Sequence, residues 1–189
     1  MSEELHWYAL RAFRGRVQKV RQAAEKAGYK TYVAMRREVV EQNGHKSAKD
    51  VQIIPQLLFV CCSSDWLMKY KYQEEHVNEF MIYSHKVKNN IGAEVLEPAP
   101  IPEKEMECFM FVTSTNNGED ISYYGESMPE FSEGERVRVT DGIYKGAEGV
   151  VKRIKRDRKL LVAVEGVAVV AISSIPMAYL EKIDTSLPG

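Results

Sequence analysis

The sequence predicts an α+β protein in two parts: an N-terminal α/β sandwich with an antiparallel sheet, followed by a small C-terminal β-barrel. In the first part, apolar residues recur with the alternating period of strands and, in places, with the longer period of amphipathic helices. After residue 131 the chain consists of short runs rich in Val and Ile, divided by glycine-containing turns. Such runs favour a closed barrel, because closure removes exposed sheet edges.

The first predicted elements are a strand and a helix. Residues 5–10 predict a strand in which Trp7 and Tyr8 point to opposite faces. A helix follows from residue 16, and Gly28 is expected to end it. Its apolar stripe consists of Val17, Val20, Ala24 and Ala27.

Two further strands, residues 31–40 and 51–62, are expected to form a long hairpin. The polar residues between them include Asn43-Gly44, a strong turn signal, so the hairpin should have an exposed, basic tip. Pro55 lacks a backbone donor and therefore indicates a bulge or an edge in the second strand.

The rest of the first part is expected to alternate between short elements. Ser64 and Asp65 can cap a helix at residues 66–72. A strand at 80–84, a turn-rich return at 85–95 and an extended proline-rich connector follow. Pro102 suits the first turn of a last helix that would pack on the sheet through Met106, Phe109, Met110 and Val112.

We therefore predict a first domain at residues 1–113, a linker at 114–130 and a barrel domain at 131–184. The linker is acidic and polar, although Ile121, Tyr123 and Tyr124 indicate that part of it docks. In the barrel, Gly142, Gly146 and Gly149 are expected to serve one tight turn.

The formal net charge of −1 conceals a segregation of charges. Residues 11–21 and 152–159 are strongly basic, whereas residues 94–135 are acidic. This asymmetry favours basic surfaces that approach nucleic acid, and solvated polar faces are the alternative.

The composition argues against an enzyme and against a membrane protein. The four histidines share no metal-ligand spacing, and no glycine-rich phosphate loop opens a helix, so we expect no metal and no cofactor. A Cys62 nucleophile is the alternative, but its position in an apolar strand favours inert packing. No apolar run is long enough to cross a membrane, which predicts a cytoplasmic protein.

Several stretches resemble one family of transcription factors. Residues 133–154, which contain GERVRVTDGIYKGAEGVVKRI, resemble the KOW motif of NusG-type elongation factors and some ribosomal proteins. The stretches HWYALRAFRGRVQKVRQAAEKAG, IIPQLLFV and PIPEKEM resemble, in order, the signatures of the NusG N-terminal domain. The resemblance implies an SH3-like barrel and a non-enzymatic regulator of transcription elongation and antitermination that binds RNA polymerase.

The resemblance also implies an apolar groove that receives the clamp helices of the polymerase. The matching residues are Trp7, Tyr8, Ile54, Pro55, Leu57 and Phe59. Because side chains alternate along a strand, we expect Tyr8, Ile54 and Leu57 to be the exposed ones. Gln56 and Leu57 replace the Gly and Tyr of the family pattern.

Basic residues of the first domain are expected to face upstream or non-template DNA. They are Arg11, Arg14, Arg16, Lys19 and Arg21 on the helix side, and His45, Lys46 and Lys49 at the hairpin tip.

In the KOW domain, the resemblance implies contact with Rho or a small-subunit ribosomal protein. The expected residues are Ile143, Tyr144, Lys145, Lys152 and Arg153. Two alternatives are that Tyr144 caps the barrel end and that the Lys and Arg series serves RNA.

The stretches IPEKEMECFMFV and AYLEKI are similar to UpxY-type antiterminators of capsular polysaccharide operons. The alternative function is that of a ribosome-associated or RNA-binding KOW protein.

Overall fold

The computed structural model describes residues 4–13, 15–42, 44–73, 76–126, 135–154, 157–173 and 175–183. The chain divides into two compact units. The N-terminal unit comprises Met1–Val33 and Pro55–Met106, and the C-terminal unit comprises Ala34–Ile54 and Glu107–Gly189. This division differs from the predicted one, because residues 34–54 and 107–113 group with the C-terminal unit.

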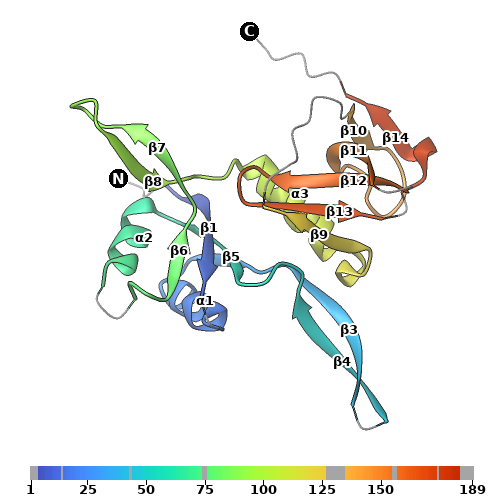
Figure 1. Cartoon of the computed structure of the whole chain (residues 1–189), viewed down its shortest axis with the longest axis horizontal. Helices are drawn as coiled ribbons and strands as arrows, with labels where there is room; N and C mark the ends of the chain where they lie inside the picture. The colour runs from blue at the N-terminus through green and yellow to red at the C-terminus, as the bar shows by residue number, and fades with distance from the viewer. Residues whose placement is uncertain are drawn as a thin grey trace. The chain divides into compact units, whose positions relative to one another are not determined.

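The N-terminal unit contains a four-stranded antiparallel sheet with the strand order β2-β5-β1-β6. Strands β5, β1 and β6 are labelled in Figure 1. The strands are β1 (His6–Ala12), β2 (Lys30–Tyr32), β5 (Leu57–Cys62) and β6 (Phe80–Ile82). Side chains from β1, β5 and β6 form one core with helix α1 (Val17–Lys26) and helix α2 (Ser64–Lys71). The two helices therefore cover one face of this sheet.

Three of the four residues of the predicted helix stripe and the helix end are confirmed, whereas Ala27 is exposed at the C-cap. Val17, Val20 and Ala24 of α1 are buried, and Gly28 has a φ of +90°, which a residue without Cβ adopts at little cost. In α2 the cap is one residue earlier than predicted. The Ser63 hydroxyl accepts a hydrogen bond from the Trp66 backbone N–H at 3.3 Å.

Two hairpins form separate two-stranded sheets, β3 (Met35–Gln42) with β4 (His45–Gln52) and β7 (Ser84–Lys88) with β8 (Glu94–Pro98). The prediction that residues 51–62 form one return strand is wrong. Residues 45–52 pair with β3, so only Val51 and Gln52 of the predicted strand do so, and a turn at residues 53–56 separates β4 from β5. Pro55 lies in this turn, outside the strands, so its missing N–H removes no hydrogen bond between strands.

The C-terminal unit contains a six-stranded antiparallel sheet with the order β14-β10-β11-β12-β13-β9, consistent with an SH3-like KOW fold. The α+β fold class is thus confirmed. The strands are β9 (Ile121–Gly125), β10 (Glu135–Val139), β11 (Glu148–Ile154), β12 (Asp157–Val164), β13 (Ala168–Ile172) and β14 (Leu180–Lys182), with the short 3₁₀ helices η1 (Thr115–Gly118) and η2 (Met177–Tyr179).

Helix α3 (Glu103–Ser114) joins the C-terminal unit from Glu107 onward, where the Cys108 thiol donates to the Glu148 carbonyl oxygen at 3.5 Å. Gly149, expected in the turn, lies within β11. A Cβ at Gly149 would lie 2.2 Å from the Leu161 carbonyl oxygen, so the close approach of β12 requires glycine there. Among the described residues, no helix has the length and apolar character needed to span a membrane.

Candidate protein-binding and nucleic-acid-binding surfaces

Tyr8 belongs to the helix-covered face of the N-terminal sheet. Its side chain is 3% exposed and packs in the core with residues of α1 and α2. Burial raises the pKa of the Tyr8 phenol, and a hydrogen bond with Ser64 at the start of α2 opposes this rise. The prediction that Tyr8 is exposed is wrong, because β1 turns this residue toward the helices.

The opposite face of the same sheet carries Trp7. Residues paired across neighbouring strands share a face, and Trp7 pairs with Cys61, while Ala9 pairs with Phe59. Phe59 also pairs with Tyr32, whose ring centroid lies 6.5 Å from its own. This second face is therefore apolar and aromatic.

The other two exposure predictions are also wrong. Leu57 is 4% exposed and lies on the second face, opposite Arg11. Ile54 is 5% exposed and belongs to the C-terminal unit. Pro55, between them, is exposed because the turn that contains it leaves the sheet.

A hollow of about 300 Å³ opens beside Trp7 in the N-terminal unit. The Trp7 carbonyl oxygen accepts a hydrogen bond from the Ile101 N–H at 2.8 Å, which holds the connector along β1. The hollow is lined mainly by apolar side chains, with one imidazole and one carboxylate at its rim. The lining residues are Leu5, His6, Trp7, Cys61, Pro100, Ile101, Pro102 and Glu103.

A buried carboxylate organises the basic side of α1. The Glu79 side chain is 3% exposed, and its Oε1 accepts hydrogen bonds from Arg16 at 2.9 Å and from Lys19. Its Oε2 lies 3.1 Å from His76 Nδ1. The Glu79 carbonyl oxygen also accepts from the Phe13 N–H at 2.8 Å, so this residue fixes the entry into α1 by both backbone and side chain.

The environment of Glu79 favours its charged form. Burial alone would raise the pKa of this carboxyl, but the hydrogen bonds and charges of Lys19 and His76 outweigh burial and lower it. Arg16 and Lys19 remain 47% and 53% exposed at their side chains, so they present partly neutralised cations to solvent.

The remaining basic residues near α1 differ in their surroundings. Arg21 donates to the Glu25 carboxylate at 2.7 Å, one helical turn away. Arg11 is half-buried in β1. Arg14 lies outside the described residues.

The β3–β4 hairpin exposes His45, Lys46 and Lys49, as predicted. Its register places opposite charges across the strands, because Lys46 pairs with Glu41 and Lys49 pairs with Glu38. Such cross-strand pairs stabilise a two-stranded sheet. They also neutralise much of the positive charge near the tip.

The loop between β10 and β11, residues 140–147 (the KOW loop), separates its two expected contact residues. Ile143 is 61% exposed, whereas Tyr144 is 5% exposed, as the alternative that Tyr144 caps the barrel end would require. The Tyr144 hydroxyl lies 3.5 Å from the Asp120 carboxylate. Burial, together with the charge and hydrogen bond of Asp120, raises the pKa of Tyr144 to about 12.

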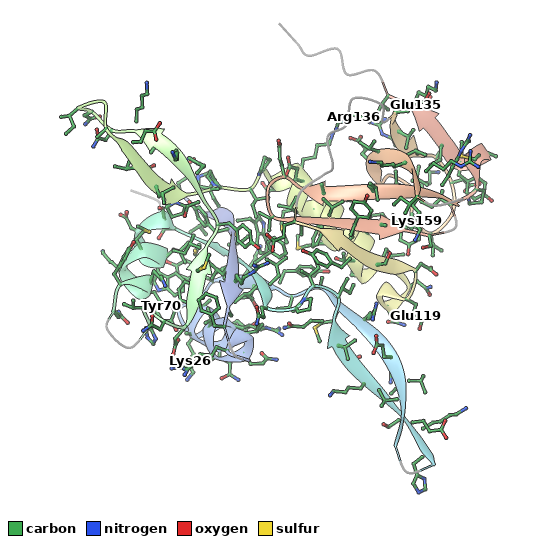
Figure 2. All side chains as sticks on the ribbon, viewed as in Figure 1. Lys26, Tyr70, Glu119, Glu135, Arg136 and Lys159 are labelled. Carbon is green, nitrogen blue, oxygen red and sulfur yellow. The ribbon has the colours of Figure 1, made fainter. Side chains whose placement is uncertain are left out.

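The β11–β12 hairpin pairs like charges directly. Lys152 is opposite Lys159, and Arg153 is opposite Arg158 (Lys159 is labelled in Figure 2). Like charges across a ladder destabilise it, and counter-ions or an anionic partner relieve this repulsion. Lys145, in the preceding loop, is exposed.

Two residues that organise these surfaces were not identified from the sequence. Glu79 and Asp120 are single acids in polar stretches, and their roles depend on partners distant in sequence. Within the described parts of the chain, no group of three or more His, Cys, Asp or Glu residues could hold a metal ion.

Comparison with known proteins relates both units to one family. Residues 5–110 match the family model described as "Transcription termination factor nusG", and residues 133–166 match the KOW motif. A solved structure described as "Domain interaction in Thermotoga maritima NusG" is similar, with 19% sequence identity, a TM-score of 0.42, and coverage of 95% of this chain and 98% of that one. No curated protein matches the sequence.

Proposed function

Because the chain belongs to the NusG family of transcription elongation and termination factors, which interact with RNA polymerase, we propose that it suppresses pausing or termination by the polymerase. The family is non-enzymatic, and we assign no catalytic residue. Similarity of the stretches IPEKEMECFMFV and AYLEKI to UpxY-type antiterminators supports action on particular operons, such as those for capsular polysaccharides.

We place the polymerase clamp helices at the hollow beside Trp7. The observation that carries this assignment is the apolar lining of that hollow, in which Leu5 is 49% exposed and Trp7 is 9% exposed. An amphipathic helix binds through apolar anchors in such a site. Of the other residues expected in the groove, Pro55 is exposed in the turn before β5, whereas Tyr8, Ile54, Leu57 and Phe59 are buried and contribute only through packing.

In the proposed mechanism, the factor binds the closed clamp better than the open one. A ligand shifts a conformational equilibrium only by its difference in affinity for the two states. Closure disfavours the pausing that accompanies clamp opening. Contacts of α1 and the β3–β4 tip with upstream or non-template DNA would add a salt-dependent contribution to affinity.

The test compares two aspartate substitutions at exposed apolar residues of the N-terminal unit. Leu5→Asp places a charge in the hollow, and we expect polymerase affinity to fall at least about tenfold, with pause half-lives returning to those without factor. Val77→Asp is the control, since Val77 is 41% exposed and does not line the hollow. Equal affinity of both variants and the unaltered protein would remove this surface from the proposal.

A second candidate, RNA binding by the KOW domain, is favoured by the like-charged pairs of β11 and β12. Replacement of Lys152 and Arg153 by Gln should then reduce the salt dependence of RNA affinity. The slope of log affinity against log salt concentration should become shallower by roughly 0.7 for each lost phosphate contact. Exchange of Lys46 and Lys49, which face acids across β3–β4, is the control. A protein partner such as Rho or a small-subunit ribosomal protein would instead depend on Ile143 and Lys145.

A further inference from the structure

Strand β9 lies on the edge of the KOW sheet, although its sequence belongs to the stretch predicted as a linker. It pairs with β13, whose five residues are all buried, and the register shifts between Val169 and Val170. Of the β9 side chains, Ile121 is buried at 2% exposure, whereas Tyr123 and Tyr124 are 37% and 38% exposed. The pairing therefore depends mainly on backbone hydrogen bonds and one apolar side chain.

The residue before β9 connects this strand to the KOW loop. The Asp120 carbonyl oxygen accepts from the Ser173 N–H at 3.1 Å, and its carboxylate lies 3.5 Å from the Tyr144 hydroxyl. The Asn116 amide donates to the same carboxylate at 2.9 Å. One short segment thus covers both the edge of β13 and the buried residue of the loop that was expected to meet a partner.

We infer that the β13 edge, together with Tyr144, is a binding site for an extended strand of a partner protein, and that residues 120–125 are its internal occupant. The edge offers unpaired backbone N–H and C=O groups once β9 leaves, and an incoming strand satisfies them by β-augmentation. The partner strand that fits this site has a carboxylate in the place of Asp120, where it reaches the Tyr144 hydroxyl. A branched apolar residue follows it in the place of Ile121. A nucleic acid offers no such ladder, so the partner is a protein.

The exchange is feasible because Ile121 is the single fully buried side chain of β9. Segments with few buried side chains at a sheet edge open at lower free energy than the strands of the core. The inference rests on the proposed role of the KOW domain in docking, but not on polymerase binding by the N-terminal unit. The two can therefore fail separately.

The key variants are Ser122→Pro and Ser122→Ala in the full chain. Asp120 and Ser173 form a hydrogen-bonded pair of the β9–β13 ladder. Hydrogen-bonded pairs recur at every second residue of an antiparallel ladder, so the next one is Ser122 with Ala171, and the Ser122 N–H is part of the ladder. Proline removes the Ser122 N–H and should release β9. Alanine removes only the hydroxyl, which lies 3.5 Å from the Ala171 carbonyl oxygen.

The probe is a labelled peptide with the chain's own sequence 117–126, NGEDISYYGE. We expect it to bind Ser122→Pro at least about tenfold more tightly than Ser122→Ala, and a peptide with Asn and Ser in place of Asp120 and Ile121 to bind neither. Ile121→Ser serves as a second releasing variant if proline unfolds the sheet. Equal binding of the peptide by releasing and control variants would overturn the inference.

Amide hydrogen exchange of the unaltered protein gives an independent check. The β9 amides should exchange through an opening that leaves the amides of β11 and β12 protected. If β9 exchanges only with the global unfolding of this unit, β9 is a fixed strand of the barrel and the inference is wrong. Unchanged polymerase binding by the releasing variants is expected, which separates this result from the test at Leu5.

Discussion

Replacement of Glu79 by Gln tests whether one buried carboxylate holds the start of α1 in place. The substitution keeps the shape of the side chain but removes its charge and puts an NH₂ group where a second acceptor was. Arg16, Lys19 and His76 then face a neutral amide. The N-terminal unit should be destabilised, whereas the C-terminal unit should be unaffected.

The magnitude follows from the exposure of the partners. Removing one member of a fully buried ion pair costs about 3–5 kcal/mol, because the remaining charge stays unpaired in the interior. Here Arg16 and Lys19 are 47% and 53% exposed, so water can take over part of their hydrogen bonding. We therefore expect a loss of about 2 kcal/mol in the free energy of unfolding, which lowers Tm by roughly 10 °C in a domain of this size.

The assay is urea unfolding followed by tryptophan fluorescence. Both tryptophans, Trp7 and Trp66, lie in the N-terminal unit, so the signal reports its unfolding. Because the pKa of Glu79 is lowered on folding, its contribution is present above the ordinary Glu pKa of about 4.3 and is lost as pH falls through the lowered value. The difference between the two proteins should accordingly be constant near neutral pH and shrink in acid.

The matched control is Glu25→Gln on the same helix. Glu25 pairs with Arg21, but its side chain is 44% exposed, and solvent screens this pair. If Glu79→Gln and Glu25→Gln change stability equally, or if the Glu79 effect persists unchanged in acid, the carboxylate does not organise this surface.

Two further predictions concern single residues in each unit. Gln56 has a φ of +68°, a left-handed conformation that costs a non-glycine residue about 1–2 kcal/mol. Gln56→Gly should therefore raise the free energy of unfolding by roughly 0.5–1 kcal/mol, because the greater freedom of glycine in the unfolded chain offsets part of the relieved strain. A loss of stability would show that the Gln56 side chain matters more than the strain. Spectrophotometric titration should show the Tyr144 phenol ionising near its raised pKa of about 12, and Asp120→Asn should lower that value. Because this pKa is raised on folding, the contribution of Tyr144 is lost as pH rises from about 10, where the unfolded phenol ionises, toward 12.

Local patterns predicted the elements whose signals lie within a few consecutive residues. The stripe of α1, its end at Gly28 and the strands β10 and β11 follow from periodicity and turn residues alone. Alternation also predicted that Trp7 and Tyr8 face opposite ways. It could not say which face the helices cover, because that choice depends on how α1 and α2 pack, and the exposure of Tyr8 was therefore wrong.

The return strand of the first hairpin was missed because its residues are polar. Residues 45–50 have no apolar alternation, and they pair with β3 through backbone bonds and opposite charges instead of through a buried face. The apolar run after Pro55 was more strand-like, yet it belongs to another sheet. Pairing between distant segments, which also brings Glu79 to Lys19, is not encoded in any local period.

Register also distinguishes two hairpins that look equally basic in sequence. In β3–β4 the cations Lys46 and Lys49 each face an acid, so the hairpin is stable without a partner and presents little uncompensated charge. In β11–β12 the pairs Lys152–Lys159 and Arg153–Arg158 repel each other, and an anionic partner would relieve that repulsion. If this chain gains affinity from nucleic acid through a hairpin, β11–β12 is therefore the stronger candidate, although the sequence alone directed attention to both.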